Sequence, residues 1–159
     1  MLFRSPALTA DDIERLKITG KFRPIKLKQG QIPTVLLIED TEEVVMMVSD
    51  YLEQNGFKVF TAHDGIEGIS QAELTHPDVI LMDIQMPRMD GFEATKKLRS
   101  QAAFANTPII ALTALAMAND RERCLEAGMD EYITKPVHLR ALVKIIETFL
   151  GGEKEIKHS

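Results

Sequence analysis

The chain has 159 residues, enough for one domain of about 100 to 150 residues and a short extension. Hydrophobic residues at 45% and charged residues at 27% are ordinary globular values, so the composition excludes a disordered or fibrous chain. The formal net charge of -5 excludes the strongly basic surface that nucleic-acid binding requires, and we expect no nucleic-acid partner.

No apolar run approaches the roughly 18 residues of a membrane span, and the N-terminus lacks the apolar region of a signal peptide. We therefore expect a cytoplasmic protein without membrane contact. Cys124 is the only cysteine, which excludes an intramolecular disulfide and favours a buried structural thiol. The histidines share no metal-ligand spacing and are expected at the surface: His63, His76, His138 and His158.

The first 32 residues differ from the rest, because they are polar, rich in Lys and Arg, and interrupted by proline and glycine. A capping-box-like pair, Thr9 and Asp12, predicts a short helix that runs to about Lys17. We interpret residues 1–32 as a linker or docking arm, residues 33–150 as the folded domain and residues 151–159 as a flexible tail.

From Thr34 onward, short apolar runs alternate with helical patterns five times. The unbroken run from Val79 to Met82, which ends in Asp83, is typical of a strand buried on both faces, as in a parallel sheet covered by helices. The expected strands lie at about 35–38, 57–60, 79–82, 107–112 and 132–134. The expected helices lie at about 42–54, 65–74, 92–100, 118–127 and 139–150.

Two of these helices carry predictions about their faces. In the first, the buried stripe is centred on four residues: Val44, Val48, Tyr51 and Leu52. That stripe leaves Met46 facing outward and Met47 at its edge. In the second helix, three residues form the expected apolar side: Ile66, Ile69 and Leu74.

Five strand–helix repeats predict an α/β fold, a doubly wound five-stranded parallel sheet in the order 2-1-3-4-5 with five flanking helices, as in flavodoxin-like proteins. Ligands bind beyond the carboxyl ends of the strands in such sheets. Strands one and three are neighbours in this order, so their ends bring Glu39, Asp40 and Asp83 into one pocket. Strands four and five add Thr113 and Lys135.

Three converging carboxylates repel one another unless a cation lies between them, and an all-oxygen ligand set suits Mg²⁺ or Mn²⁺. Lys135 supplies a fixed positive charge and Thr113 a hydroxyl donor, both of which an incoming phosphoryl group needs. A carboxylate can itself be the nucleophile in phosphoryl transfer, which yields an aspartyl phosphate. Asp83, at the end of the central strand, is the candidate.

With these residues in place, the chain from about 34 to 150 resembles the receiver domain of response regulators, the CheY-like domain of two-component signalling. The matching residues follow strand ends at consistent spacing: the pair Glu39 and Asp40, then Asp83, then Met86 and Pro87 with Asp90 and Gly91, then Thr113 and Ala114, then Tyr132, and finally Lys135 and Pro136. The amino-acid sequences of these segments are most similar to those of receivers attached to hybrid sensor histidine kinases.

The resemblance implies a role for each of these positions. Asp83 is the expected phosphoacceptor, Thr113 and Lys135 assist it, and the domain catalyses its own phosphorylation and dephosphorylation without being an enzyme of the usual kind. Asp40, Asp83 and the backbone carbonyl of Gln85 are the expected metal ligands. Glu39 stands where Asp is commonest, and its longer side chain reaches the metal directly or through water. The expected conformational switch consists of Thr113, Ala114 and Tyr132, and Pro136 is the expected cis proline.

The implied partner is a histidine kinase or a histidine phosphotransfer protein, docking on the first helix at Val44, Met46 and Met47. Two origins stay open: a single-domain relay, or a receiver that belongs to a larger hybrid kinase, which the linker-like residues 1–32 favour.

Three other functions fit the sequence less well. A flavodoxin-like cofactor binder would need hydroxyls and backbone donors around its phosphate, whereas residues 39–43 include four acidic side chains. A metal-dependent phosphatase with an Asp nucleophile would need a second carboxylate where this chain has Gln85. A pseudo-receiver, which acts as an interaction module without phosphorylation, is disfavoured because Asp83, Thr113 and Lys135 are all present.

Overall fold

A computed structural model describes residues 30–114 and 120–151. Residues 1–29, which hold the predicted short helix at Thr9 to Lys17, and most of the predicted tail lie outside the described residues. The strands are β1 (Thr34–Ile38), β2 (Lys58–Ala62), β3 (Val79–Asp83), β4 (Ile109–Thr113) and β5 (Glu131–Thr134). The helices are α2 (Glu42–Gln54), α3 (Gly65–Thr75), α4 (Gly91–Arg99), the short 3₁₀ helix η1 (Ala102–Phe104), α5 (Asp120–Ala127) and α6 (Leu139–Phe149).

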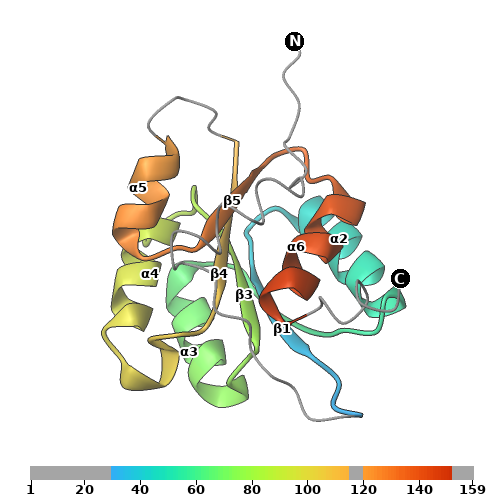
Figure 1. Cartoon of the computed structure of the whole chain (residues 1–159). Coiled ribbons are helices and arrows are strands. Elements are labelled where there is room, and N and C mark those ends of the chain that lie inside the picture. Colours follow the sequence, from blue (N-terminus) through green and yellow to red (C-terminus); the bar gives the residue numbers. More distant parts are fainter. Residues whose placement is uncertain (1–29, 115–119, 152–159) are drawn as a thin grey trace.

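All five strands form one parallel sheet in the order β2-β1-β3-β4-β5, which confirms the predicted topology (Figure 1). The register pairs Ile38 of β1 with Met82 of β3, and Asp83 of β3 with Leu112 of β4. The residues that follow β1 and β3 therefore lie at the same edge of the sheet, as the sequence predicts.

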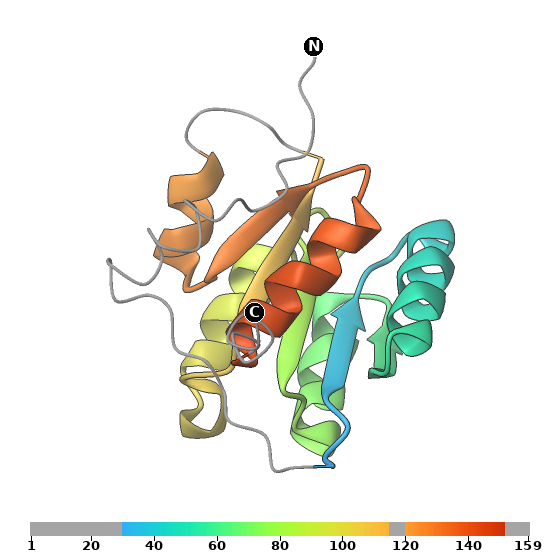
Figure 2. The same ribbon diagram turned by 45° about the vertical axis from the view of Figure 1, so that its right-hand side comes forward.

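Two layers of helices cover the sheet. Helices α2 and α6 lie on one face and α3, α4 and α5 on the other, an arrangement that stays visible when the molecule is turned (Figure 1, Figure 2). Successive side chains of a strand point to opposite faces, so Val35 and Leu37 join the core under α2 and α6, whereas Leu36 and Ile38 join the core under α3 and α4. Because both faces are buried, the strands carry the continuous apolar runs seen in the sequence.

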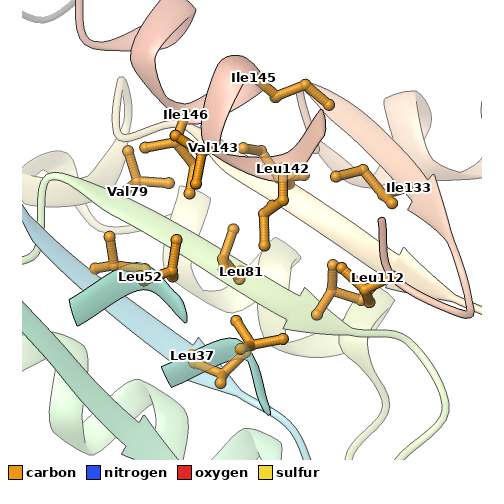
Figure 3. Close-up of a cluster of buried hydrophobic side chains, with 14 of the residues drawn as sticks. Leu37, Leu52, Val79, Leu81, Leu112, Ile133, Leu142, Val143, Ile145 and Ile146 are labelled. Carbon is orange, nitrogen blue, oxygen red and sulfur yellow. The ribbon is translucent and has the colours of Figure 1, made fainter. Parts of the chain in front are cut away.

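Helix α6 covers the sheet with one apolar stripe, whose members recur at helical spacing. Its side chains face Leu81 of β3, Leu112 of β4 and Ile133 of β5 (Figure 3). The residues of α6 that this core buries are Leu142, Val143, Ile145, Ile146 and Phe149.

Helix α2 has the predicted bounds, but its buried stripe is rotated by about one residue. Val45, Val48 and Leu52 are buried, whereas Val44 and Tyr51 lie half-buried at the margin. The five consecutive apolar residues 44–48 fit several rotations about the helix axis, and packing against the sheet selects one of them.

Helix α3 corrects the prediction for its apolar side. Ile66 and Leu74 are exposed, Ile69 is half-buried, and the buried side consists of small residues: Gly65, Gly68 and Ala72. The helix lies so close to β1 that a Cβ added to Gly68 would stand 2.5 Å from Ile38 Cδ1. Such a close approach needs small side chains at the contact, so the large apolar ones point outward.

One strand end differs from the prediction, and the thiol is buried as predicted. Strand β2 runs to Ala62, two residues beyond the predicted end, because its ladder pairs all five residues of β1. Cys124 is free and buried, and burial raises the pKa of its thiol to about 11. Within the described residues, no helix is both long and apolar enough to cross a membrane.

Candidate functional site

Three carboxylates converge where β1 and β3 end. Glu39 and Asp40 follow β1, Asp83 is the last residue of β3, and one carboxylate oxygen of each lies within 4.8 Å of the others. Glu39 is 0% exposed and Asp83 2%, whereas Asp40 is exposed. The sequence prediction that these three residues share one pocket is therefore met by the geometry.

Lys135 reaches the same pocket from the loop after β5. Its Nζ lies 3.0 Å from Glu39 Oε1, 3.1 Å from Glu39 Oε2 and 3.4 Å from Asp83 Oδ1. The backbone holds this loop in place, since the Lys135 N–H donates to the Thr113 carbonyl at 2.7 Å. The Lys135–Pro136 peptide bond is cis, as expected. One ammonium group thus contacts two carboxylates, those of Glu39 and Asp83.

The charges in this pocket are perturbed accordingly. Burial, together with the neighbouring Glu39 carboxylate, raises the pKa of Asp83 to about 7 against the opposing effect of Lys135. Burial alone would lower the pKa of Lys135, but its hydrogen bond to Glu39 and the Asp83 charge outweigh burial and raise it. The cluster carries excess negative charge, which a further cation would offset.

The donors available for such a cation are oxygens only, the set that Mg²⁺ prefers. Asp40 and Asp83 offer carboxylate oxygens at the pocket, whereas Glu39 already binds Lys135 and accepts from the Thr41 N–H at 3.1 Å. Gln85 is beside them, because its N–H donates to Asp83 Oδ1 at 3.3 Å. The residues present fit a magnesium ion.

Thr113 ends β4, where its carbonyl accepts from the Lys135 N–H, and Tyr132 lies on β5. Thr113 is fully buried and Ala114 is exposed. Tyr132 is half-buried against the core under α3 and α4, with the Arg121 guanidinium 6.0 Å from the centre of its ring. Arg121 also binds the buried Glu131 carboxylate at 2.7 Å, and burial raises the pKa of the Tyr132 phenol.

The loop from β3 to α4 is closed by short-range contacts. The Gly91 N–H donates to the Ile84 carbonyl at 2.8 Å, and a Cβ on Gly91 would stand 2.5 Å from the Asp83 carbonyl oxygen. The Asp90 side chain caps α4 by accepting from the Glu93 N–H at 2.9 Å. These contacts explain why Asp and Gly occur together at the end of this turn.

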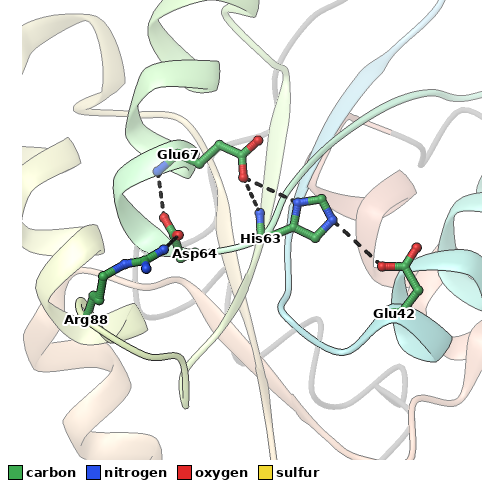
Figure 4. A network of polar contacts seen from close by, with 5 residues as sticks. All are labelled: Glu42, His63, Asp64, Glu67 and Arg88. Carbon is green, nitrogen blue, oxygen red and sulfur yellow. Dashed lines mark hydrogen bonds and ion pairs between the residues drawn. The ribbon is translucent and has the colours of Figure 1, made fainter.

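One polar network beside the pocket was not predicted from the sequence (Figure 4). Arg88, in the loop after β3, forms an ion pair with Asp64, which precedes α3 and caps it by accepting from the Glu67 N–H at 2.8 Å. His63 lies between Glu67 and Glu42 of α2, at 3.3 and 3.8 Å. The sequence His63-Asp64-Gly65 before a helix signals the cap, but nothing in it signals the pairing with Arg88.

The predicted docking residues lie on the outer side of α2. Met46 is 58% exposed and Met47 40%, while Val44 is half-buried. The histidines of the described region, His63, His76 and His138, are exposed as predicted, and His158 lies outside it.

Comparisons with known proteins place the chain in a family. A family model described as the response regulator receiver domain matches residues 35–147. The polar-differentiation response regulator DivK of Brucella ovis is 36% identical over 118 residues, which are 74% of this chain and 96% of DivK. The chemotaxis protein CheY4 of Vibrio cholerae has a similar structure, with a TM-score of 0.72 and 32% identity over 76% of this chain and 100% of that one.

A third similar structure bears on the cation. It is the receiver domain of a Pseudomonas aeruginosa sensor histidine kinase, described with a magnesium ion coordinated in its active-site cleft. The TM-score is 0.71 and the identity 38%, over 76% of this chain and 99% of that one.

In metal-free protein, Asp83→Asn should raise the melting temperature, and more at pH 8 than at pH 5. The folded-state pKa of Asp83, about 7, lies above the ordinary aspartate value of 3.8. The contribution of the Asp83 carboxyl group to folding stability is therefore fully present below its pKa in the unfolded chain. It is lost progressively as the pH rises toward 7. Asparagine never ionises and escapes that loss.

Thermal unfolding followed by circular dichroism with a chelator present measures this difference. Asp50→Asn, which removes an exposed carboxylate of α2, is the control and should give no such pH dependence. An equal gain at both pH values would show that the ionised Asp83 carboxylate is not the destabilising group.

Proposed function

Because this chain belongs to the family of response regulator receiver domains, we propose that Asp83 accepts a phosphoryl group from a phosphohistidine on a histidine kinase or a histidine phosphotransfer protein. The observation that carries the proposal is the position of Asp83. Its buried carboxylate ends the central strand, clusters with Glu39 and Asp40, and lies 3.4 Å from the Lys135 ammonium. A receiver domain is a phosphoacceptor switch, and these groups supply what phosphoryl transfer needs.

In the transfer, an Asp83 carboxylate oxygen attacks the phosphorus while the phosphorus–nitrogen bond of the donor histidine breaks. The electron pair of that bond stays on the histidine ring nitrogen, and the phosphoryl group becomes an aspartyl phosphate. Lys135 and the Thr113 hydroxyl stabilise the phosphoryl oxygens. In dephosphorylation, which the same residues assist, water attacks the phosphorus and the Asp83 carboxylate leaves.

Asp40, Asp83 and the Gln85 carbonyl would hold a Mg²⁺ ion. A bound magnesium ion offsets the negative charge of the three carboxylates and of the phosphoryl group. Glu39 already binds Lys135, so its link to the metal is through water or follows release of the lysine. We propose that the receiver domain spans residues 33–150, with residues 1–32 as a linker or docking arm.

Under Mg²⁺, a small-molecule phosphodonor should add the mass of one phosphoryl group to the protein, and Asp83→Asn should abolish the addition because the nucleophile is gone. Asp40→Asn should weaken metal binding and slow labelling without moving the site. Intact-mass spectrometry measures both effects, with a chelator as the control. Label that persists in Asp83→Asn would overturn the assignment, as would an unlabelled wild-type protein, which would favour the pseudo-receiver.

Phosphorylation at Asp83 adds negative charge and acceptor oxygens next to β4. We propose that the Thr113 hydroxyl moves toward the phosphoryl group and that the Tyr132 ring moves inward past the small Ala114. The half-buried state of Tyr132 supports this, since its ring lies between solvent and the core under α3 and α4. An inward movement would draw the ring away from Arg121.

Fluoroberyllate, a phosphoryl mimic, should therefore shift the NMR signals of Thr113, Tyr132 and α5 together. In Thr113→Ala the ligand should still bind, while the Tyr132 and α5 signals respond less because the hydroxyl that transmits the change is missing. A response confined to residues 39–41 and 83–91 in the wild-type protein would contradict the proposed switch.

We propose further that the histidine-bearing partner docks on the exposed apolar side of α2, formed by Met46 and Met47 with Val44 beside them. Helix α2 begins three residues after Glu39, so a partner on it lies next to the phosphoacceptor pocket. Unbranched, polarisable methionine side chains adapt to a partner's helices. Neither methionine belongs to the core clusters of the described residues.

Changing both Met46 and Met47 to Lys should slow phosphotransfer from a histidine-phosphorylated partner by about tenfold or more, because docking is lost. Labelling by a small phosphodonor should stay nearly unchanged, because the pocket is intact. Leu74→Lys is the matched control, since Leu74 is 75% exposed on α3 in the other helix layer. Equal loss with both donors would mean that α2 is destabilised, and loss with neither would place docking elsewhere.

A further inference from the structure

The loop between β3 and α4 carries Gln85, whose N–H donates to Asp83 Oδ1 at 3.3 Å. The apolar side chains Ile84 and Met86 of this loop are buried in the core under α3 and α4, and Met89 packs against that core. The Gly91 N–H closes it onto the Ile84 carbonyl, and at Gly65 an added Cβ would stand 2.9 Å from the Met89 carbonyl oxygen. The loop therefore rests directly on the first turn of α3.

Arg88 adds the one side-chain ion pair that joins this loop to α3 within the described residues. Asp64, its partner, is 7% exposed and is held from the other side by its cap bond to the Glu67 N–H at 2.8 Å. Both carboxylate oxygens are used, Oδ1 by the cap and Oδ2 by Arg88. Asp64 is thus a fixed anchor, and Arg88 ties the loop to it (Figure 4).

The backbone at Arg88 supports a specific use of the side chain. Its φ is +69°, in the left-handed region where glycine is the unstrained residue. A turn that needed only this conformation would be served better by glycine. With arginine at this position the backbone is strained, and the side chain forms an ion pair.

We propose that Arg88 is a positioning residue: its ion pair with Asp64 holds the loop so that Gln85 stays beside Asp83, and the affinity of the site for a divalent cation depends on it. The inference rests on the proposed function, in which Asp83 and Gln85 serve the cation. Arg88 itself touches neither the metal nor the phosphoryl group. With the tie removed, the loop moves away from α3 and the Gln85 contact with Asp83 is lost first.

The test is a Mg²⁺ titration of the full chain, followed by NMR without phosphodonor, on Arg88→Gly, Asp64→Asn and the double variant. Glycine keeps the left-handed backbone without strain, and asparagine keeps the oxygen that caps α3. Each single variant should weaken Mg²⁺ binding severalfold, and the double variant should be no weaker than either, because both remove the same tie. Arg88→Lys should restore part of the affinity.

The direction of the change in Mg²⁺ affinity distinguishes positioning by Arg88 from a simple effect of charge. Removing the Arg88 cation would by charge alone strengthen Mg²⁺ binding, whereas removing the Asp64 anion would weaken it. Tighter binding by Arg88→Gly, unchanged affinity, or additive losses in the double variant would each overturn the proposal. Glu67→Gln, which alters the neighbouring contact with His63 but not the tie, is the control and should bind Mg²⁺ like the wild-type protein.

Hydrogen exchange and urea unfolding distinguish a local loosening of the loop from a loss of global stability. Amide hydrogen exchange of residues 85–91 should accelerate in both single variants, while the midpoint of urea unfolding should change little, because the Arg88 side chain is 65% exposed. If wild-type Asp83 is not phosphorylated, the proposed function fails. If it is phosphorylated and the Arg88 variants bind Mg²⁺ normally, only this inference fails.

Discussion

Two buried carboxylates, Glu39 and Asp83, share one ammonium group, that of Lys135. Burying like charges together is unfavourable, and the raised pKa of Asp83 expresses that cost. The pocket cannot relax because its members are attached to the ends of β1, β3 and β5, whose register is fixed by the ladder and by the cores on both faces. The stability of the sheet thus holds these three charged groups together in one pocket.

Much of the fold follows from the chain pattern. Continuous apolar runs predicted strands covered on both faces, and five repeats with right-handed crossovers left one simple strand order, which is the observed one. The faces of the helices were less predictable. In α3, apolarity pointed to Ile66 and Leu74, but close packing on β1 selects for small size, and Gly68 lies at the contact instead. Apolar periodicity does not report how near a helix approaches its sheet.

The site follows from the sequence to a similar extent. Glu39, Asp40 and Asp83 could be brought together because strand order alone determines which strand ends are neighbours. The double contact of Lys135 with Glu39 and the tie from Arg88 to Asp64 depend on loop conformations that no periodic pattern encodes. Asp64 and Arg88 are 24 residues apart, and their pairing requires a left-handed residue in one loop and a helix cap in the other.

The buried thiol of Cys124 has a practical consequence. It lies on α5, the helix that carries Arg121 beside Tyr132, and with a pKa of about 11 it is almost wholly protonated at neutral pH. An alkylating reagent can reach it only when α5 separates from the sheet. The rate of alkylation therefore measures the local opening of this helix, separately from global unfolding. Because it is the sole cysteine of the chain, its alkylation reports on the motion of α5 beside β5 without an engineered label.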